Sequence, residues 1–428
     1  MNETNLLKKY GSPLYVYNED ILKQKAENML KFAEKLKAET GIPEIIMHYS
    51  TKANGNLYIL KKLRGLGLSV DAMSPAELRL AELAGFGRKD ILYVCNNISA
   101  EEMTEVIDKD IMICLDSISQ LELLGQCRGV EKRNTCEEYT LRPIPDINVL
   151  IRINPETEGI GHSEKVVTSG KHAKFGVSEE NIPELLSAAE KYGIKIAGIH
   201  QHLGSLFLND KIDDYIEGVK AGLRIAKTYF KDLEIVDLGG GFGVPYKEDE
   251  EDLDLDMLAE KLSPILSEFA YEYHIAQLKF EPGRYIPCEA GYILGTVNAI
   301  KDEMGKIWIG TDIGMNVLLR PSMYDAYHKI EIIPVGAGAL GDPSQYITAT
   351  IVGNVCESCD ILGEDRNILK PELGDIVKIY NAGAYGYCMA SNYTGRPRPA
   401  EIMINKNGAD VSIRKRDTVG DIVRSLKL

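Results

Sequence analysis

The chain has 428 residues, of which 44% are hydrophobic and 26% charged, and it carries a formal net charge of -15. This length exceeds that of one ordinary domain and predicts two, while the acidic charge argues against nucleic acid and anionic membranes as partners. No run reaches about 18 uninterrupted apolar residues, so we expect no membrane span, although a few buried arginines could still form a local pocket for an anionic substrate.

Short apolar strands alternate with amphipathic helices over the first two-thirds of the chain. Helices are predicted, for example, at Pro75–Ala84, Asn181–Tyr192 and Asp214–Tyr229. The segment from Gln126 to Pro145 interrupts the alternation and is expected to be a surface insertion. Eight successive β-α units favour a closed parallel (β/α)8 TIM-like barrel over an open sheet. The eight predicted strands are Ile45–Tyr49, Leu68–Ala72, Ile91–Val94, Met112–Leu115, Ile147–Ile153, Ile196–His200, Glu234–Leu238 and Leu278–Phe280.

The pattern changes after about Tyr285, where short β-type runs are punctuated by Gly and Pro. This pattern predicts a second, mostly antiparallel β domain. We expect a barrel over residues 20–285 and a β domain over 286–428, with residues 1–19 contributing the strand Leu14–Tyr17 to the β domain. The predicted strands of this domain are Tyr292–Ile300, Lys306–Gly310, Glu331–Val335, Tyr346–Gly353 and Ile376–Tyr380.

Polar residues or glycines follow every predicted barrel strand. Reactive groups of such barrels gather at the carboxyl ends of the strands. Loops are polar in any protein, which is enough to explain Asn96 and Asp116 but explains the rest of the set poorly. The residues at the strand ends are Lys52, Asp71 with Ser74, Asn96, Asp116, Arg152, His202 with Ser205, Gly239–Gly241, and Glu281 with Arg284.

Four of these strand ends suggest chemistry. Lys52 would more often be an ordinary solvated lysine, but at a barrel mouth it can form a Schiff base if neighbours depress its pKa. The triglycine Gly239–Gly241 is equally compatible with a phosphate cradle and with a plain tight turn. In the Glu-Pro-Gly-Arg run at 281–284, the glycine amide could reach a phosphate and the carboxylate could face a ring nitrogen. A lone His202 is more often structural, yet its flat imidazole could stack on an aromatic cofactor.

The eight cysteines are scattered and suggest no disulfide framework, and the first twenty residues contain no apolar core of a secretory signal. We therefore expect reduced thiols in a cytoplasmic protein. Cys356 and Cys359 form a Cys-x-x-Cys pair, but no second ligand pair accompanies it, so no metal site is expected.

Longer motifs resemble one known family. They are YSTKANGN, VDAMSPAEL, HLGS, DLGGGFG, FEPGRYI, LRPSMYDAYH, VCESCD and GAYG with RPRPAE, and together they span residues 11–415. The chain thereby resembles the diaminopimelate decarboxylases, within the pyridoxal-phosphate decarboxylases built on an alanine-racemase-like barrel. It departs from that family where Gly161, rather than the usual Thr, precedes His162, and in the length of the Gln126–Pro145 insertion.

The resemblance implies a role for each matching residue. Lys52 would bind pyridoxal 5'-phosphate as a Schiff base, Glu281 would bond the pyridine nitrogen, and His202 would stack on the ring. The phosphate would be held by Ser205, Gly241 and the Pro282, Gly283, Arg284 stretch, with Tyr385 also contacting the cofactor. The substrate would be bound by Arg284, Arg320, Tyr324, Tyr385 and Glu357. Cys356 would donate the proton, and in this family Cys356 and Glu357 come from the neighbouring chain of a homodimer.

The implied reaction converts meso-2,6-diaminopimelate to L-lysine and CO2, the last step of lysine biosynthesis. A sister decarboxylase for ornithine, lysine, arginine or carboxynorspermidine is the first alternative, but Arg320 with Glu357 suits a zwitterionic distal group. An alanine-racemase-like enzyme should offer a tyrosine base where this chain has Cys-Glu-Ser. A non-catalytic carrier of the cofactor would need no β domain.

Overall fold

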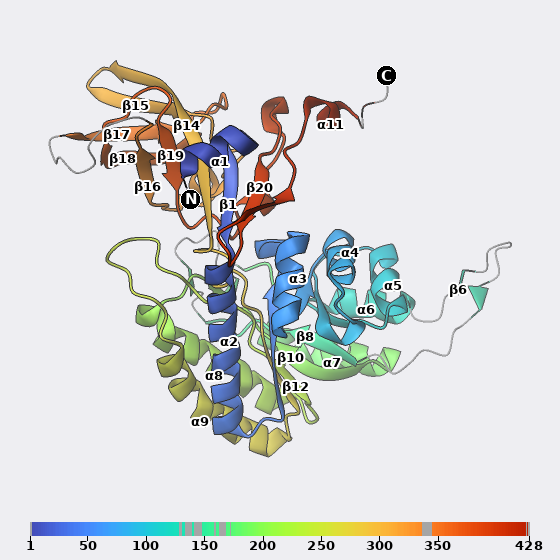
Figure 1. Cartoon of the computed structure of the whole chain (residues 1–428). Coiled ribbons are helices and arrows are strands. Elements are labelled where there is room, and N and C mark those ends of the chain that lie inside the picture. Colours follow the sequence, from blue (N-terminus) through green and yellow to red (C-terminus); the bar gives the residue numbers. More distant parts are fainter. Residues whose placement is uncertain are drawn as a thin grey trace.

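The computed structural model describes residues 2–127, 131–132, 139–140, 148–157, 160–161, 168–171, 173–335, 345–424 and 426. A barrel surrounded by helices occupies one end of the molecule, and a β-sheet region lies at the other end (Figure 1). The predicted fold class is confirmed: a parallel (β/α)8 barrel accompanied by a mostly antiparallel sheet. The domain boundary at residues 285 and 286 stays a prediction.

Eight parallel strands close the barrel in the order β10-β12-β13-β2-β3-β4-β5-β8, which is their sequence order around the ring. Each of the eight predicted strands is present. The closure pairs β13 with β2, where Phe280 lies opposite Met47. The strands are β2 Glu44–Ser50, β3 Ser69–Ala72, β4 Ile91–Val94, β5 Met112–Leu115, β8 Asn148–Arg152, β10 Lys195–His200, β12 Ile235–Asp237 and β13 Gln277–Phe280.

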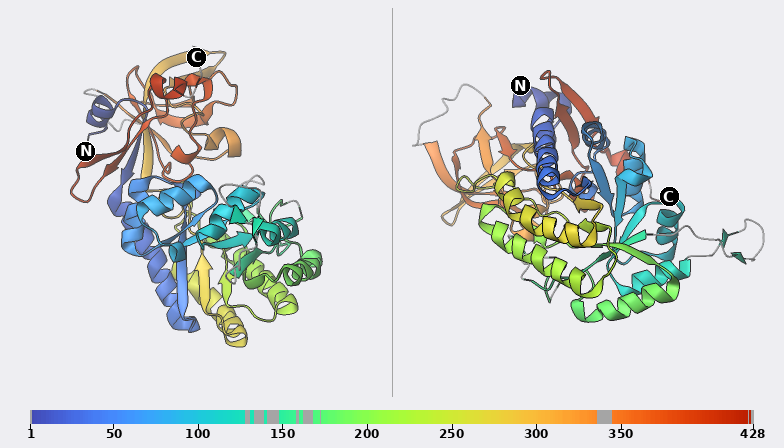
Figure 2. Two further views of the ribbon diagram at one scale, coloured as in Figure 1. Left: turned by 90° about the vertical axis from the view of Figure 1, so that its right-hand side faces the viewer. Right: turned by 90° about the horizontal axis from the view of Figure 1, so that it is seen from below.

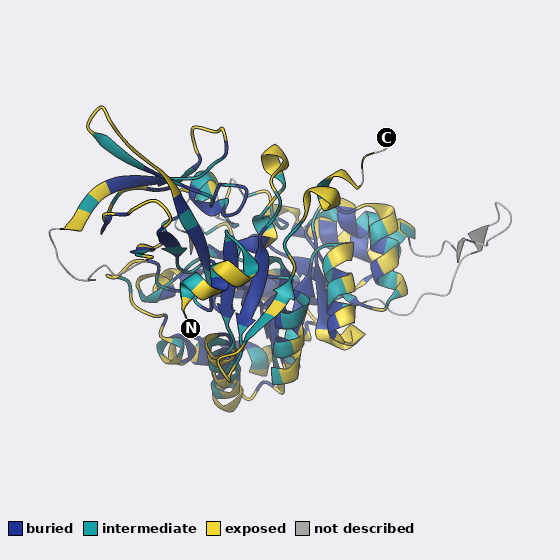
Figure 3. Cartoon of the chain, turned by 45° about the horizontal axis from the view of Figure 1, so that its top comes forward, coloured by how far each residue is buried: buried dark blue, intermediate teal, exposed yellow. Residues whose placement is uncertain are grey.

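Helices form the outer ring of the barrel (Figure 2). In α4 (Pro75–Ala84), the Ser74 hydroxyl accepts from the Glu77 amide at 3.3 Å, and Gly85 ends the helix in the left-handed region. Its buried residues Leu78, Ala81 and Ala84 recur every three residues and face the strands. The other barrel helices are α2 Glu19–Thr40, α3 Leu57–Leu66, α5 Ala100–Asp108, α6 Ile118–Cys127, α7 Ile182–Tyr192, α8 Ile212–Tyr229 and α9 Leu255–Tyr273. Figure 3 shows the result: buried strands inside and exposed outer helix faces.

The second region is a nine-stranded sheet. Strand β1 (Leu14–Asn18) joins it as predicted, antiparallel to β14 and parallel to β20. Strands β15 and β17 are also parallel, while the remaining pairs are antiparallel. Strands β18, β20 and β21 were not predicted. The other strands are β14 Gly291–Glu303, β15 Lys306–Thr311, β16 Ile330–Ile333, β17 Tyr346–Val352, β18 Ile361–Leu369, β19 Ile376–Ile379, β20 Ala400–Ile404 and β21 Asp410–Arg414, and the helices near them are α1 Glu3–Tyr10, α10 Arg320–Tyr324 and α11 Val419–Val423.

The expected insertion contains two short paired strands, β6 (Glu131–Lys132) and β7 (Tyr139–Thr140). Most of its remainder, and also His162, lie outside the described residues. Strand β9 (Ile160–Gly161) pairs with β11 (Gly204–Ser205). Within the described ranges, the helices are all too short or too polar to traverse a bilayer.

Candidate active site

A cavity of about 250 Å³ opens at the carboxyl ends of the barrel strands. Barrel residues form most of its wall, and three residues from the later part of the chain complete it: Arg320, Tyr324 and Tyr385. Ten of the thirteen predicted site residues therefore line one cavity. The lining includes Ser50, Lys52, Met73, Cys95, Asn96, Arg152, Thr168, Phe175, His202, Ser205, Gly241, Glu281, Gly283, Arg284, Arg320, Tyr324 and Tyr385.

Lys52 lies just beyond β2, in a short turn of 3-10 helix. Burial alone would lower the pKa of its amine, but Asp71, Tyr385 and Glu281 raise it, and the net effect is a raised pKa. The neighbours of Lys52 therefore do not depress its pKa, which was the condition named above for forming a Schiff base. Asp71 makes the largest contribution that raises the pKa of Lys52, while burial and Glu281 raise the pKa of Asp71 itself, and its side chain accepts a 2.5 Å hydrogen bond from the Ser50 hydroxyl.

Glu281 follows β13 and is buried beside His200, with 3.3 Å between Oε1 and Nε2. Burial would raise the pKa of Glu281, but His200 and then Lys52 lower it, and the net pKa is lowered. The carboxylate is therefore ionised at neutral pH and suited to face a protonated ring nitrogen. Ligand atoms of His200, Asp237 and Glu281 lie within 4.8 Å of one another, a spacing that a metal ion could also use. Of these three residues, only Glu281 lines the cavity.

His202 is held by the triglycine that follows β12. The Gly240 amide donates to His202 Nδ1 at 3.0 Å, and burial lowers the pKa of the imidazole well below its usual value. The ring is thus neutral, with its proton on Nε2. A Cβ at Gly240 would lie 2.2 Å from the Glu281 carbonyl oxygen, and Gly239 and Gly241 have φ of +66° and +105°. The triglycine is therefore a tight turn that also lets backbone line the cavity.

Arg284 forms a second corner of the cavity with Ser205 and Tyr385. Its Nη2 donates to the Ser205 hydroxyl at 3.1 Å, and its guanidinium lies 4.8 Å from the Tyr385 ring centroid. A Cβ at Gly283 would come within 3.0 Å of the Tyr385 hydroxyl, so glycine keeps this corner open. Hydroxyl, guanidinium and glycine backbone together suit a phosphate group.

Arg320 begins α10 and is buried, with 1% of its surface exposed. In the described part of the chain, no carboxylate lies within ion-pair distance of Arg284 or Arg320. Buried charges are normally paired, so two unpaired guanidiniums at one cavity indicate an anionic ligand.

Three predicted site residues do not line the cavity. Cys356 and Glu357 are exposed, and the Tyr393 hydroxyl donates to the Glu357 carboxylate. Pro282 lies behind the wall, where its carbonyl accepts from the Ser50 amide at 3.2 Å. The structure therefore separates the expected proton donor from the expected cofactor lysine within one chain.

Sequence reasoning gave no role to several residues of the site. Arg152 and Phe175 line the cavity together, with the guanidinium 4.5 Å from the ring centroid. Tyr246 and His328 contact its arginines from behind. In the sequence, only the position of Arg152 at a strand end pointed to the site. His328 was noticed only as part of the motif LRPSMYDAYH, and nothing in the sequence pointed to Phe175.

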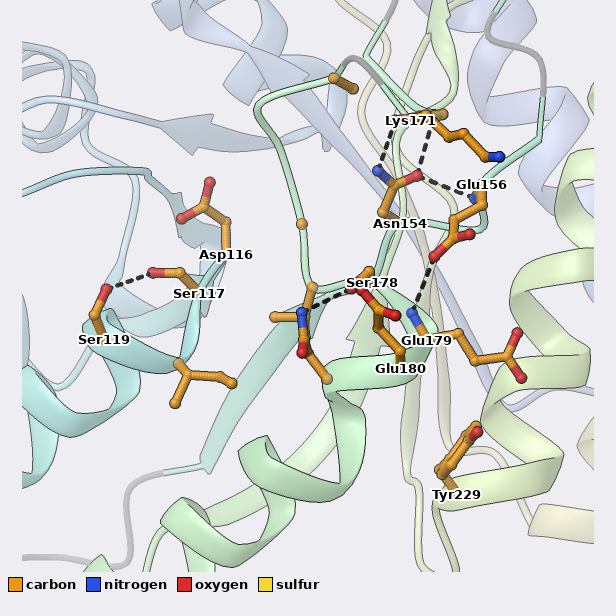
Figure 4. A pocket seen from close by; sticks show the side chains of 16 residues that line it. Asp116, Ser117, Ser119, Asn154, Glu156, Lys171, Ser178, Glu179, Glu180 and Tyr229 are labelled. Carbon is orange, nitrogen blue, oxygen red and sulfur yellow. Dashed lines mark hydrogen bonds between the residues drawn. The ribbon is translucent and has the colours of Figure 1, made fainter.

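A larger hollow of about 1050 Å³ lies beside the barrel, between the segments after β5 and β8. Figure 4 shows its polar wall, where Asn154 Oδ1 accepts from the Glu156 amide at 3.0 Å. Asp116, Glu179 and Glu180 also line it, and none of the predicted site residues does. The smaller cavity is the one that combines a buried amine, a buried carboxylate and unpaired guanidiniums.

Comparison with known proteins points to one family. Residues 27–288 match the family model "Pyridoxal-dependent decarboxylase, pyridoxal binding domain". The diaminopimelate decarboxylase of Methanothermobacter thermautotrophicus is 36% identical over 98% of this chain and 92% of its own length. The diaminopimelate decarboxylase of M. jannaschii, solved with L-lysine, has a TM-score of 0.84 at 31% identity and covers 100% of this chain and 94% of its own. That of Helicobacter pylori, also with L-lysine, has a TM-score of 0.84 at 29% identity, covering 99% and 98%.

Proposed function

The chain belongs to the diaminopimelate decarboxylases, a family of pyridoxal-dependent decarboxylases, and from this premise we propose that it converts meso-2,6-diaminopimelate to L-lysine and CO2. The choice of substrate depends on one observation. The buried guanidiniums of Arg284 and Arg320 lie in the same cavity as Lys52 and Glu281, and in the described part of the chain neither has a carboxylate partner. A cofactor phosphate and a substrate carboxylate would supply the two missing anions.

The cavity residues fit pyridoxal phosphate. When bound, that cofactor supplies a charged aromatic ring that accepts the electron pair left by departing CO2. Lys52 would hold it covalently, and Glu281 would keep the ring nitrogen protonated. His202 would lie on one face of the ring. Ser205, Gly241, Gly283 and Arg284 would surround the phosphate, with Pro282 supporting this stretch from behind the wall, and Tyr385 would close the ring edge.

Substrate binding falls to the residues that reach the cavity from the later part of the chain. Arg320 and Tyr324 would bind the carboxylate that the product keeps, with Arg284 and Tyr385 beside them. Holding the substrate by this remote group orients the departing carboxylate and reduces the freedom that the reaction must otherwise remove. Diamino acids without a second carboxylate would leave Arg320 buried without a partner, at a cost of about 1–3 kcal/mol or more.

The proton that replaces CO2 would come from Cys356, and Glu357 would bind the distal ammonium. Both residues are exposed and lie outside the cavity of their own chain. We therefore propose a homodimer in which each cavity receives Cys356 and Glu357 from the neighbouring subunit. The free state of the described cysteines suits a cytoplasmic enzyme, which we also propose.

A release assay for CO2 tests the substrate. The purified protein with added cofactor is offered meso-diaminopimelate, lysine, ornithine and arginine at equal concentration. We expect turnover of meso-diaminopimelate alone, since the other three lack a distal carboxylate. Faster release from ornithine or lysine would favour the sister decarboxylases and overturn the assignment.

A further inference from the structure

Tyr246 connects the two arginines of the cavity. Nη1 of Arg284 and Nη1 of Arg320 both donate to its phenolic oxygen, each at 2.9 Å. A phenolic oxygen has two lone pairs, so both are used, and its own O–H must then be a donor. Cys288 Sγ lies 3.0 Å away to accept that hydrogen, and the thiol in turn donates to the Asn381 carbonyl at 3.3 Å. In each of these hydrogen bonds, the donor and the acceptor are therefore fixed.

His328 fixes the orientation of Arg320. Its Nδ1 lies 2.8 Å from the Tyr380 carbonyl, which can only accept, so Nδ1 carries the hydrogen. Burial lowers the pKa of His328 well below its usual value, and the ring is neutral. Nε2 is therefore an acceptor, and it lies 2.8 Å from Arg320 Nη1. Tyr246 and His328 thus take both hydrogens of Nη1.

The remaining edge of the Arg320 guanidinium is formed by Nε and Nη2. Nε is fully buried and has no hydrogen-bond partner among the described residues. A carboxylate binds a guanidinium best through two parallel hydrogen bonds. Because Nη1 is occupied, only the Nε and Nη2 edge can make such a pair, and an unpaired buried Nε is costly until a ligand accepts from it.

We propose that Tyr246 is a positioning residue that, together with His328, holds Arg320 so that its Nε and Nη2 edge receives the carboxylate that the substrate keeps. This inference rests on the proposed function. It adds that Tyr246 contributes to the selectivity of the enzyme for substrates with two carboxylates. By binding Arg284 through the same oxygen, Tyr246 also fixes the distance between the phosphate corner and the carboxylate-binding edge.

The proposed product and one analogue of it distinguish a positioning role of Tyr246 from a merely structural role. L-Lysine retains the carboxylate that Arg320 would bind, whereas cadaverine is the same diamine without it. Loss of positioning should weaken L-lysine and spare cadaverine, while a general loosening of the cavity should weaken both. The ratio of the inhibition constants for the two ligands, measured with the holoenzyme, therefore reports on how well the retained carboxylate is bound.

The test compares Tyr246→Phe with Tyr215→Phe. Both changes remove one buried hydroxyl, but the Tyr215 hydroxyl has no hydrogen-bond partner among the described residues. For Tyr246→Phe we expect KM for meso-diaminopimelate and the inhibition constant of L-lysine to rise about tenfold, with kcat within about twofold and cadaverine inhibition unchanged. Tyr215→Phe should leave all four values within about twofold.

Equal weakening of L-lysine and cadaverine, or an unchanged KM, would overturn the proposal. If Tyr246→Phe does not fold, His328→Phe removes the second acceptor of Nη1 and should raise the L-lysine constant about threefold while sparing cadaverine; equal effects on both, or none, again count against it. Failure of the wild-type protein to decarboxylate meso-diaminopimelate would defeat the proposed function instead. In that case the binding of both ligands, read from the absorption of the cofactor, still tests Tyr246.

Discussion

The barrel side of the cavity and the side formed by the later part of the chain hold their polar groups differently. On the barrel side, Lys52, His202 and Glu281 each follow a parallel strand, and their protein neighbours fix both position and charge. On the other side, Arg320 is fixed but lacks an anion, while Cys356 is exposed away from the cavity. One chain therefore brings together the residues expected to bind the cofactor, whereas the expected proton donor lies outside the cavity of its own chain, which is why we propose that a second subunit supplies it.

Substitution of the lysine is the strongest test of the barrel side. Lys52→Ala should lower kcat by about a thousandfold or more, because it removes the amine that would bind the cofactor. The visible absorption band of the bound cofactor should disappear with it. Activity and cofactor absorption are measured on the same preparation. A variant that keeps both would show that the barrel side is not the cofactor site.

The second test concerns Cys356, the expected proton donor, which lies outside the cavity of its own chain. Cys356→Ala should lower kcat by about a hundredfold, since a positioned proton donor is worth that much, while the absorption of the bound cofactor persists. Cys359→Ala, three residues away and equally exposed, is the control and should keep normal turnover.

Mixed subunits test where Cys356 acts. Combining inactive Lys52→Ala and Cys356→Ala proteins creates dimers with one intact cavity, so activity should return to about a quarter of wild type if the subunits exchange at random. No recovery, in a mixture proven to exchange subunits, would place Cys356 and Lys52 in the same chain's site.

Arg320 tests the substrate side alone. Arg320→Ala should raise KM for meso-diaminopimelate about thirtyfold, because a charged hydrogen-bonded pair is lost, and should leave cofactor absorption intact. Steady-state kinetics over a range of substrate concentrations provide the value. Arg79→Ala, at an exposed arginine of the outer helix α4 that does not line the cavity, is the control. An unchanged KM would show that Arg320 does not bind the distal carboxylate of the substrate.

The raised pKa of Lys52 predicts the smallest effect, on loading of the cofactor. Only the neutral amine reacts with an aldehyde, and below its pKa the neutral fraction grows roughly tenfold per pH unit. The rate at which cofactor-free protein regains its absorption band should therefore increase from pH 7 to higher pH. Asp71→Asn removes the largest contribution that raises this pKa and should accelerate loading at pH 7. Asp116→Asn is the control, and equal rates in both variants would contradict the assigned cause.

The sequence predicted the barrel well because its strands are nearly continuous apolar runs. Strands β18 and β21 were missed because Ile361–Leu369 and Asp410–Arg414 carry charges that hide the β pattern. Residues at strand ends were found because a barrel brings its strand ends together wherever they fall in the sequence. No such rule applies to Tyr246 and Arg320, which are 74 residues apart and meet only through the packing of two regions.

The place of β1 has a consequence for biosynthesis. Leu14–Asn18 is paired on one side with β14 and on the other with β20, and Leu14 lies opposite Leu294 and Ala400, so the second neighbour is synthesised long after the first. A nascent chain leaving the ribosome can close its barrel once residue 280 has emerged, and β1 can pair with β14 soon afterwards, but the other edge of β1 stays open until β20 is made near the end of translation. A chaperone that covers this early strand would therefore protect the chain during the longest interval of its synthesis.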